Sequence, residues 1–157
     1  MKFKWLILPA ILLACVSIGF AQTKKMEIKV FLVALGDDGK KGTKIGCDDS
    51  LVPVMRTIKK TTATLKASIE ELLSIPRDFD GGLSNYWGGQ DLKVKSVSLK
   101  SGTATIYLTG TNPAVAGVCD PPRFFETIEA TAKQFSSVKK VKVFINGKAL
   151  DKIITAV

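Results

Sequence analysis

Two cysteines and five aspartates are the residues whose types and positions could support a defined chemistry. Apart from Cys15, the chain has only Cys47 and Cys119. In an oxidising compartment such a pair is typical of one disulfide, with two unrelated buried thiols as the alternative. We therefore expect a Cys47–Cys119 bond that ties the loop before one strand to the start of a helix.

Aspartates stand next to both cysteines and in the loop that precedes them. The group consists of Asp37, Asp38, Asp48, Asp49 and Asp120. The disulfide would bring Asp48 and Asp49 near Asp120, and oxygen ligands gathered in this way can hold calcium. The loop spacing and the bidentate glutamate of a known calcium motif are both missing. We favour a helix cap at Asp120 and solvated aspartates elsewhere, and we expect no metal and no cofactor.

The composition also restricts catalysis. The chain contains no histidine, which excludes Ser-His and Cys-His mechanisms and histidine-based zinc sites. The spacing of the carboxylates does not indicate two acids facing a cleft. We predict that the protein is not an enzyme.

Two adjacent aromatic residues are the best candidates for ligand binding. Tyr86 and Trp87 lie in a loop between two Gly-Gly pairs. Exposed aromatics on a loop can stack on a sugar or anchor a partner protein. The alternative, which we favour, is that Trp87 folds back over the end of the hydrophobic core.

Hydrophobic periodicity indicates the elements that position these residues in the first half of the chain. Residues 26–35 are apolar on both faces in their second half, which favours a central strand, and residues 51–58 form a second strand. A helix follows, with Thr61 or Thr62 as its cap and Pro76 at its end. Its buried stripe is Leu65, Ile69, Leu72 and Leu73.

The second half of the chain also has two strands followed by a helix, and its two strands form a hairpin. Residues 92–99 form a strand with a phase slip that indicates a bulge, and residues 103–109 alternate as its antiparallel partner. A helix begins at Asp120, and a last strand covers residues 141–145 before a tight turn. The buried stripe expected on this helix is Phe125, Ile128, Ala132 and Phe135.

The resulting order is β, β, α, β, β, α, β. It predicts a single two-layer α/β domain in which two helices pack on a mixed or antiparallel sheet. We place this domain at residues 26–148, with a tail at 149–157 that returns as a short strand or lies loose.

The first 21 residues are typical of an export signal, with Lys2 and Lys4 before an apolar run that ends at Ala21. Cleavage after Ala21 is the interpretation we favour. A lipoprotein signal with lipidation at Cys15 is the alternative, and an uncleaved anchor is the third. The protein is therefore expected outside the cytoplasm, on a membrane only if lipidated at Cys15.

The net charge of +9 would draw an exported protein to anionic surfaces such as lipid head groups or wall polymers, although lysines spread over the surface are the simpler interpretation. The longest basic run, Lys139 to Lys142, has no interleaved stacking aromatics, so we expect no nucleic-acid partner.

Several stretches together resemble the GerMN domain family of sporulation and spore-germination proteins. LVPVMRTI and ASIEELLSIP match the family's strand and its helix ending in Leu-Leu and proline. VKSVSLKSGTATIYLTG matches its hairpin, and FFETIEATAKQFSSVKKVKVFINGK matches its last helix and strand. The similarity spans residues 26–148 and departs from the family pattern at Tyr86 and Trp87.

The resemblance implies an extracytoplasmic α/β domain, related in architecture to ring-building modules of the sporulation machinery, with no catalytic residues to transfer. From it we predict a non-catalytic cell-envelope domain that binds an envelope protein or assembles with itself. The alternative is a module that binds the glycan of peptidoglycan.

Overall fold

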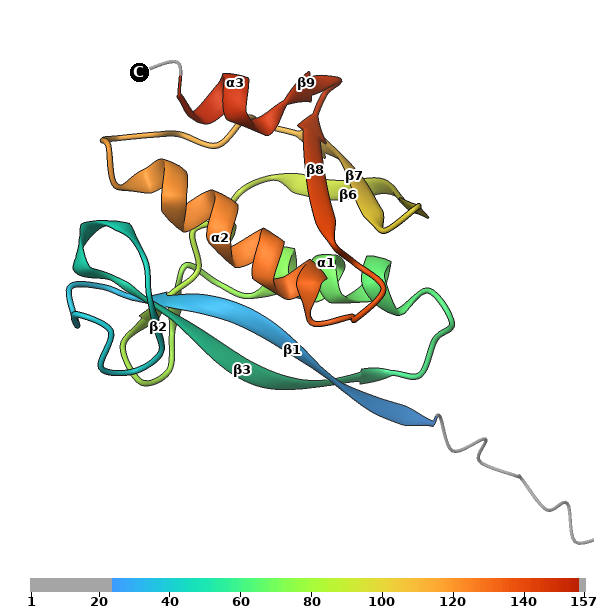
Figure 1. Cartoon of the computed structure of the whole chain (residues 1–157), viewed down its shortest axis with the longest axis horizontal. Helices are drawn as coiled ribbons and strands as arrows, with labels where there is room; N and C mark the ends of the chain where they lie inside the picture. Colours follow the sequence, from blue (N-terminus) through green and yellow to red (C-terminus); the bar gives the residue numbers. More distant parts are fainter. Residues whose placement is uncertain (1–23, 156–157) are drawn as a thin grey trace, which may run out of the picture.

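Two β-sheets enclose a layer of two helices (Figure 1). The computed structural model describes residues 24–155, so the predicted signal at residues 1–21, with Cys15, lies outside the described residues. The first sheet has the strand order β2 (Thr43–Lys44), β3 (Ser50–Lys59), β1 (Lys25–Ala34), β5 (Leu83–Ser84), β4 (Asp78–Phe79). The second has the order β6 (Leu92–Lys100), β7 (Thr103–Gly110), β8 (Lys140–Ile145), β9 (Lys148–Ala149).

Strand β1 is the central strand that its sequence predicts. It pairs with β3 in antiparallel register along its whole length, from Lys25 opposite Lys59 to Ala34 opposite Ser50. Val30, Leu32 and Val33 are all 0% exposed. Both faces of its second half are therefore covered, which explains the continuous apolar run.

The second sheet contains the predicted hairpin. Strands β6 and β7 are antiparallel, and the register shifts between Val94 and Ser96, which confirms the bulge. Strand β8 then pairs with β7 in parallel. A parallel pair needs a crossover connection, and α2 (Asp120–Lys133) provides it.

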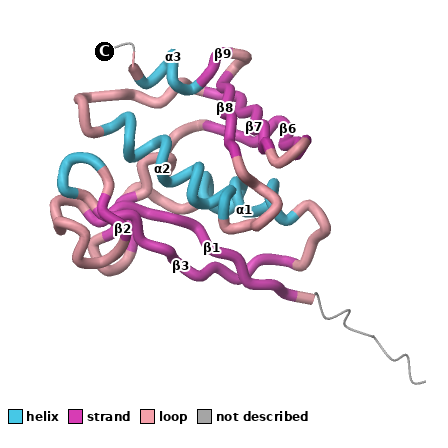
Figure 2. The backbone as a smooth tube through the Cα atoms, viewed as in Figure 1, coloured by secondary structure: helices cyan, strands magenta, loops and turns pink. Residues whose placement is uncertain are grey.

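The two long helices contact both sheets. Helix α1 (Thr64–Ser74) packs on β1 and β6, while α2 packs on β1 and β8. Because α2 lies between two sheets, it buries a wider arc than the predicted stripe: Ile128 and Ala132 are buried as expected, but Phe124 is buried more deeply than Phe125. The tube in Figure 2 shows the same layering.

The predicted side-chain caps are wrong for both helices. Helix α1 begins after Ala63 with no side-chain cap, and the Thr61 hydroxyl accepts the Ala63 N–H in the turn before it. The Asp120 carboxylate accepts the Ala116 N–H, outside the helix, at 2.8 Å. Both helices are held by burial of an apolar face, which contributes more than a cap.

The C-terminal residues belong to the core. Residues expected as a tail form the end of β9 and a short helix, α3 (Leu150–Ile154). Leu150 is 1% exposed and Ile154 is 3% exposed, so the domain extends beyond residue 148. The mixed α/β class is confirmed, with the strands divided between two sheets. No helix within residues 24–155 has the length and apolar character to cross a membrane.

Candidate functional site

The predicted disulfide is present and joins two distant parts of the chain. Cys47 lies in a short 3-10 turn, η1 (Gly46–Asp48), and Cys119 immediately precedes α2. Their Cα atoms are 5.7 Å apart, within the usual range for a disulfide. The bond fixes the loop before β3 against the start of α2.

Next to the disulfide, Arg123 binds both Asp49 and Asp120, which the sequence analysis expected to lie close together. Arg123 Nε donates to the Asp49 carboxylate at 2.6 Å, and Arg123 Nη1 lies 3.3 Å from the Asp120 carboxylate. The Asp49 side chain is only 1% exposed. Burial acts to lower the pKa of Arg123, but the hydrogen bond from Asp49 and the neighbouring charges outweigh it, and the pKa is raised. Arg123 therefore stays charged, and its contacts with the two aspartates are structural.

The other aspartates are also bound to groups of the same loop. Asp37 accepts the Ser50 hydroxyl, while Asp38 and Asp48 share the Lys44 ammonium. Within residues 24–155, no three or more Asp, Glu, Cys or His side chains are placed to hold a metal ion.

Tyr86 and Trp87 are buried, so the prediction of exposed ligand-binding aromatics is wrong. Trp87 is 0% exposed and Tyr86 is 4% exposed. Trp87 Nε1 donates to the Phe124 carbonyl and to the Thr127 hydroxyl, both at 3.1 Å. The alternative, in which Trp87 covers the end of the core, describes the structure.

The tyrosine ring has its own partners. Arg77 lies with its Cζ 3.8 Å from the centroid of the Tyr86 ring, and Arg123 Nη1 donates to the Tyr86 hydroxyl at 2.7 Å. Two cations therefore surround Tyr86 and hold it against α2, and its ring is not available to a ligand.

Tight packing of the preceding loop explains this burial. The Asn85 amide donates to the Leu72 and Ile75 carbonyls at 2.8 Å, which satisfies carbonyl groups at the C-terminal end of α1. A Cβ at Gly88 would overlap the backbone of Ile75 and Pro76. The glycine next to Trp87 therefore serves close backbone packing.

A hollow of about 550 Å³ lies beside the end of β3 and α1. Its carboxylates are Glu70 and Glu71, and each forms an ion pair, with Lys66 at 3.3 Å and with Arg56 at 2.7 Å. Both acids of this hollow are therefore paired with cations of the same chain.

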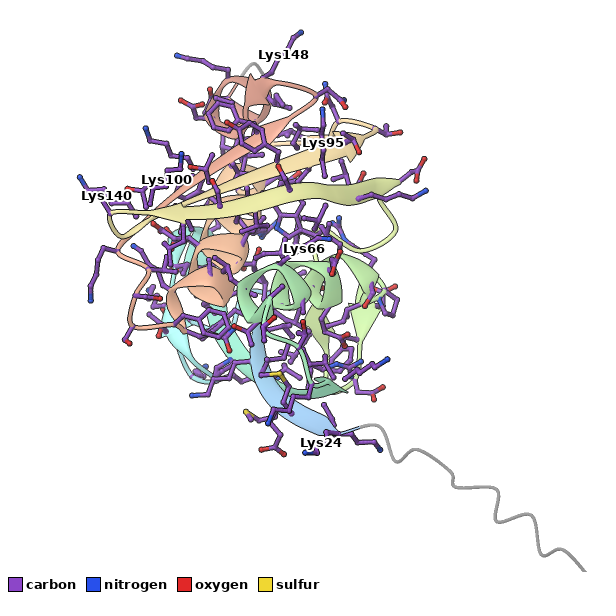
Figure 3. The ribbon with its side chains drawn as sticks, turned by 90° about the vertical axis from the view of Figure 1, so that its right-hand side faces the viewer. Lys24, Lys66, Lys95, Lys100, Lys140 and Lys148 are labelled. Atoms are coloured by element: carbon purple, nitrogen blue, oxygen red, sulfur yellow. A yellow bond between two sulfur atoms is a disulfide. The ribbon has the colours of Figure 1, made fainter. Side chains whose placement is uncertain are left out.

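The outer face of the second sheet differs from the rest of the surface. Register places Lys93, Lys100, Lys140 and Lys142 on the same side as Thr105 and Tyr107, opposite the buried residues of β7. We call this surface the lysine face. Lys95 in the bulge and Lys148 in β9 are exposed next to it. Figure 3 shows Lys95, Lys100 and Lys140 around the second sheet, with Lys24 at the far end of the first.

The lysine face carries one sign of charge. Strands β6 to β9 contain six lysines and no aspartate or glutamate. None of the six forms a salt bridge with another described residue. Tyr107 and Phe144 stack between the lysines, with ring centroids 5.1 Å apart and planes 17° from parallel.

A family model described as "Germane: Sporulation and spore germination" matches residues 30–151. The chain belongs to this family. The match covers the disulfide, α1, α2 and the lysine face, and it confirms the resemblance derived from the sequence. No curated protein matches this Germane-family chain.

Solved structures show the same fold. The first GerMN domain of the sporulation protein GerM from Bacillus subtilis is 21% identical, with a TM-score of 0.58, over 83% of this chain and 90% of that one. The tandem GerMN domains of the same protein are 22% identical, with a TM-score of 0.58, over 79% of this chain. This Germane-family chain spans 40% of the tandem-domain chain.

Sequence reasoning missed the lysine face of this Germane-family domain. A signal was present: in β8, lysines at 140 and 142 alternate with valines at 141 and 143. The lysine face can be recognised only when the parallel register of β7 and β8 is known, because this register joins residues almost 40 positions apart in the sequence.

Proposed function

We propose that this Germane-family chain is a non-catalytic binding module of the cell envelope, and that its partner site is the lysine face. The single observation that supports the proposal is a sheet face with exposed lysines and no carboxylate on its strands. Surfaces of one sign steer oppositely charged partners and favour their association.

The register brings lysines of different strands together. Lys100 and Lys140 both neighbour Thr103, from opposite sides. Their backbones are therefore two strand spacings apart, about 10 Å, close to the screening length at physiological salt. An acidic partner surface would relieve this repulsion, whereas solvent leaves it in place.

The proposal places the protein outside the cytoplasm, because residues 1–21 have the pattern of an export signal. The expected partner is an acidic envelope protein. The peptidoglycan alternative lost its main support when Tyr86 and Trp87 proved buried. Tyr107 on the lysine face is partly exposed and stacks on Phe144.

The test compares the wild-type chain with a variant in which Lys93, Lys100, Lys140 and Lys142 are changed to glutamate. The matched control changes Lys24, Lys25, Lys59 and Lys60, which are exposed at the far end of the first sheet. Both variants have the same net charge. We measure binding to isolated envelopes, to protease-treated peptidoglycan and to anionic lipid vesicles.

The proposal predicts salt-sensitive binding to intact envelopes that is lost after protease treatment. The lysine-face variant should bind at least tenfold more weakly, and the control variant should bind nearly as well as wild type. Equal binding by both variants would contradict the proposal. Full retention on protease-treated peptidoglycan would support the glycan alternative, and retention on vesicles a lipid partner.

A further inference from the structure

Strand β8 has an open edge along the second sheet. It pairs with β7 over its whole length, from Lys140 to Ile145. On its other side it pairs with β9 only through Phe144 and Ile145. Residues 140–143 therefore border the sheet with no neighbouring strand among the described residues.

The backbone groups on this edge point outward. Lys140 N–H donates to the Gly102 carbonyl and Asn146 N–H donates to the Leu108 carbonyl, both at 3.0 Å and both toward β7. Because successive amides of a strand point in opposite directions, those of Val141 and Val143 point away from β7. No turn or loop hydrogen bond within residues 24–155 uses these amides.

In the first sheet β3 is unpaired on one side beyond Leu51, and β1 is unpaired on one side before Val33, but α2 covers the open side of β1. Gln134 accepts the Lys29 N–H at 2.8 Å and donates to the Lys29 carbonyl at 2.7 Å. The Thr131 hydroxyl accepts the Phe31 N–H at 3.1 Å. Proteins usually cover such edges to prevent unwanted pairing, and this chain does so on β1 but not on β8.

An apolar groove runs beside the open edge. It has a volume of about 380 Å³ and is lined by Phe125 of α2, Val141 and Val143 of β8, and Leu150 of α3. Lys142 and Asp151 lie at its rim. Figure 2 shows β8 to one side of α2, with β9 and α3 near its upper end. A groove of this size can hold one or two apolar side chains.

We propose that the open edge of β8 accepts an extended segment of a partner protein in which apolar and acidic residues alternate. An added strand satisfies the Val141 and Val143 backbone groups, and its side chains point alternately to the two faces of the sheet. On the inner face they meet the apolar groove. On the outer face they meet Lys140 and Lys142 of the lysine face. The inference rests on the proposed function and specifies how the partner is held.

Charge disfavours a second copy of this chain as the occupant. Pairing of two β8 edges would place Lys140 and Lys142 opposite the same lysines of the copy. The other edge of the second sheet is β6, which carries three lysines and a bulge. Pairing with either edge of the second sheet therefore brings ammonium groups together, and an acidic segment fits better.

The test uses the full chain and a capped six-residue peptide of alternating glutamate and valine. Amide exchange is followed by NMR at Val141 and Val143. The inference predicts that the peptide slows exchange at both amides at least tenfold. A peptide of alternating lysine and valine, and one with glutamates and valines in separate blocks, should leave exchange unchanged.

Peptides with N-methylated backbone amides distinguish strand pairing with β8 from nonspecific adsorption to the protein surface. N-methylation of the alternate amides that face β8 should abolish binding, whereas methylation of the other set should preserve it. In the chain, Val141→Pro removes an outward N–H without removing a bond to β7 and should weaken binding at least tenfold. The double change Lys140→Glu and Lys142→Glu should reverse the preference, so that the lysine-valine peptide binds.

Each contrary outcome has a clear meaning. Equal binding of both methylated peptides would overturn strand addition in favour of adsorption. Exchange protection at Val141 and Val143 without peptide, growing with protein concentration, would identify a second copy as the occupant. Loss of envelope binding in the lysine-face variant, with no protection of the β8 amides by peptide, would retain the proposed function and reject this inference.

Discussion

The two sheets of this protein differ in how far their charges and edges are paired within the molecule. In the first sheet and its loops, Lys44 pairs with Asp38 and Asp48, and Arg56 pairs with Glu71. The open edge of β1 is satisfied by Thr131 and Gln134. In the second sheet, six lysines have no carboxylate on their strands, and the β8 edge is open.

This difference separates stability from binding. Groups paired within the molecule contribute to the fold, and their removal should lower the free energy of unfolding. Groups without a partner inside the molecule should be replaceable at little cost in the free energy of unfolding, but their replacement should weaken binding to a partner protein. Five changes test that contrast, from the largest expected effect on stability to the smallest.

Trp87→Ala should have the largest effect. The ring is fully buried and its Nε1 donates two hydrogen bonds, so we expect a loss of about 3 to 5 kcal/mol in the free energy of unfolding. Tyr107→Ala on the second sheet, where the ring is 39% exposed, should cost clearly less. Urea denaturation measures both, and similar losses would weaken the contrast between the regions.

Removal of the disulfide should come next. Changing Cys47 and Cys119 to serine opens a loop with a sequence separation of 72, for which the loop-entropy model gives about 4 kcal/mol, with real bridges often giving less. The same loss should follow reduction of the native protein by dithiothreitol. A melting temperature insensitive to both treatments would show that the bond does not stabilise this end of the molecule.

Asp49→Ala tests the buried ion pair. It leaves Arg123, whose side chain is 16% exposed, without its closest partner, and breaking such a pair costs about 3 kcal/mol. Asp38→Ala is the matched control in the same loop. Because Asp38 and Lys44 are both more than half exposed, that change should cost at most about 0.5 kcal/mol.

The four glutamate substitutions on the lysine face should change stability very little. Exposed positions usually contribute within about 0.5 kcal/mol each, and the four glutamates repel one another on adjacent strands much as the four lysines do. Circular dichroism during thermal unfolding checks this result. A large loss of stability would mean that these lysines support the fold, and their effect on binding could then not be assigned to the surface.

Titration of Asp37, beside the first sheet, should have the smallest effect on the free energy of unfolding. The Ser50 hydroxyl is the main cause that lowers the pKa of Asp37 below its ordinary value of 3.8. Because the folded pKa is below the unfolded one, the contribution of Asp37 is complete above 3.8 and is lost as the pH falls through the folded value. Asp37→Asn should reduce the slope of stability against pH in this window by up to about one proton. An unchanged slope would show that Asp37 does not titrate differently in the folded state.

Local patterns in the sequence predicted local structure well. The double-sided apolar run of β1, the bulge in β6 and the antiparallel pairing of β6 with β7 follow from side-chain alternation and backbone preference, which act over a few residues. The Cys47–Cys119 bond followed from there being only two cysteines beyond Cys15. The family resemblance rested on the same local patterns and was confirmed.

Properties that depend on distant residues could not be predicted in this way. A strand pattern shows that one face is buried but not which sheet the strand joins, so the two sheets were expected as one. The burial of Trp87 depends on Phe124 and Thr127 of α2, which lie far along the chain. The lysine face likewise requires the parallel register of β7 with β8.

Photo-crosslinking in the producing cell tests the central claim most directly, that the lysine face is the partner site. A crosslinking amino acid is placed at Ser98 on the outer face of β6, or at Thr57 on the outer face of β3, both exposed positions. We predict a discrete protein adduct from Ser98 that disappears when Lys93, Lys100, Lys140 and Lys142 are changed to glutamate, and none from Thr57. Adducts from Thr57 but not from Ser98, or a Ser98 adduct that survives the four changes, would contradict the claim.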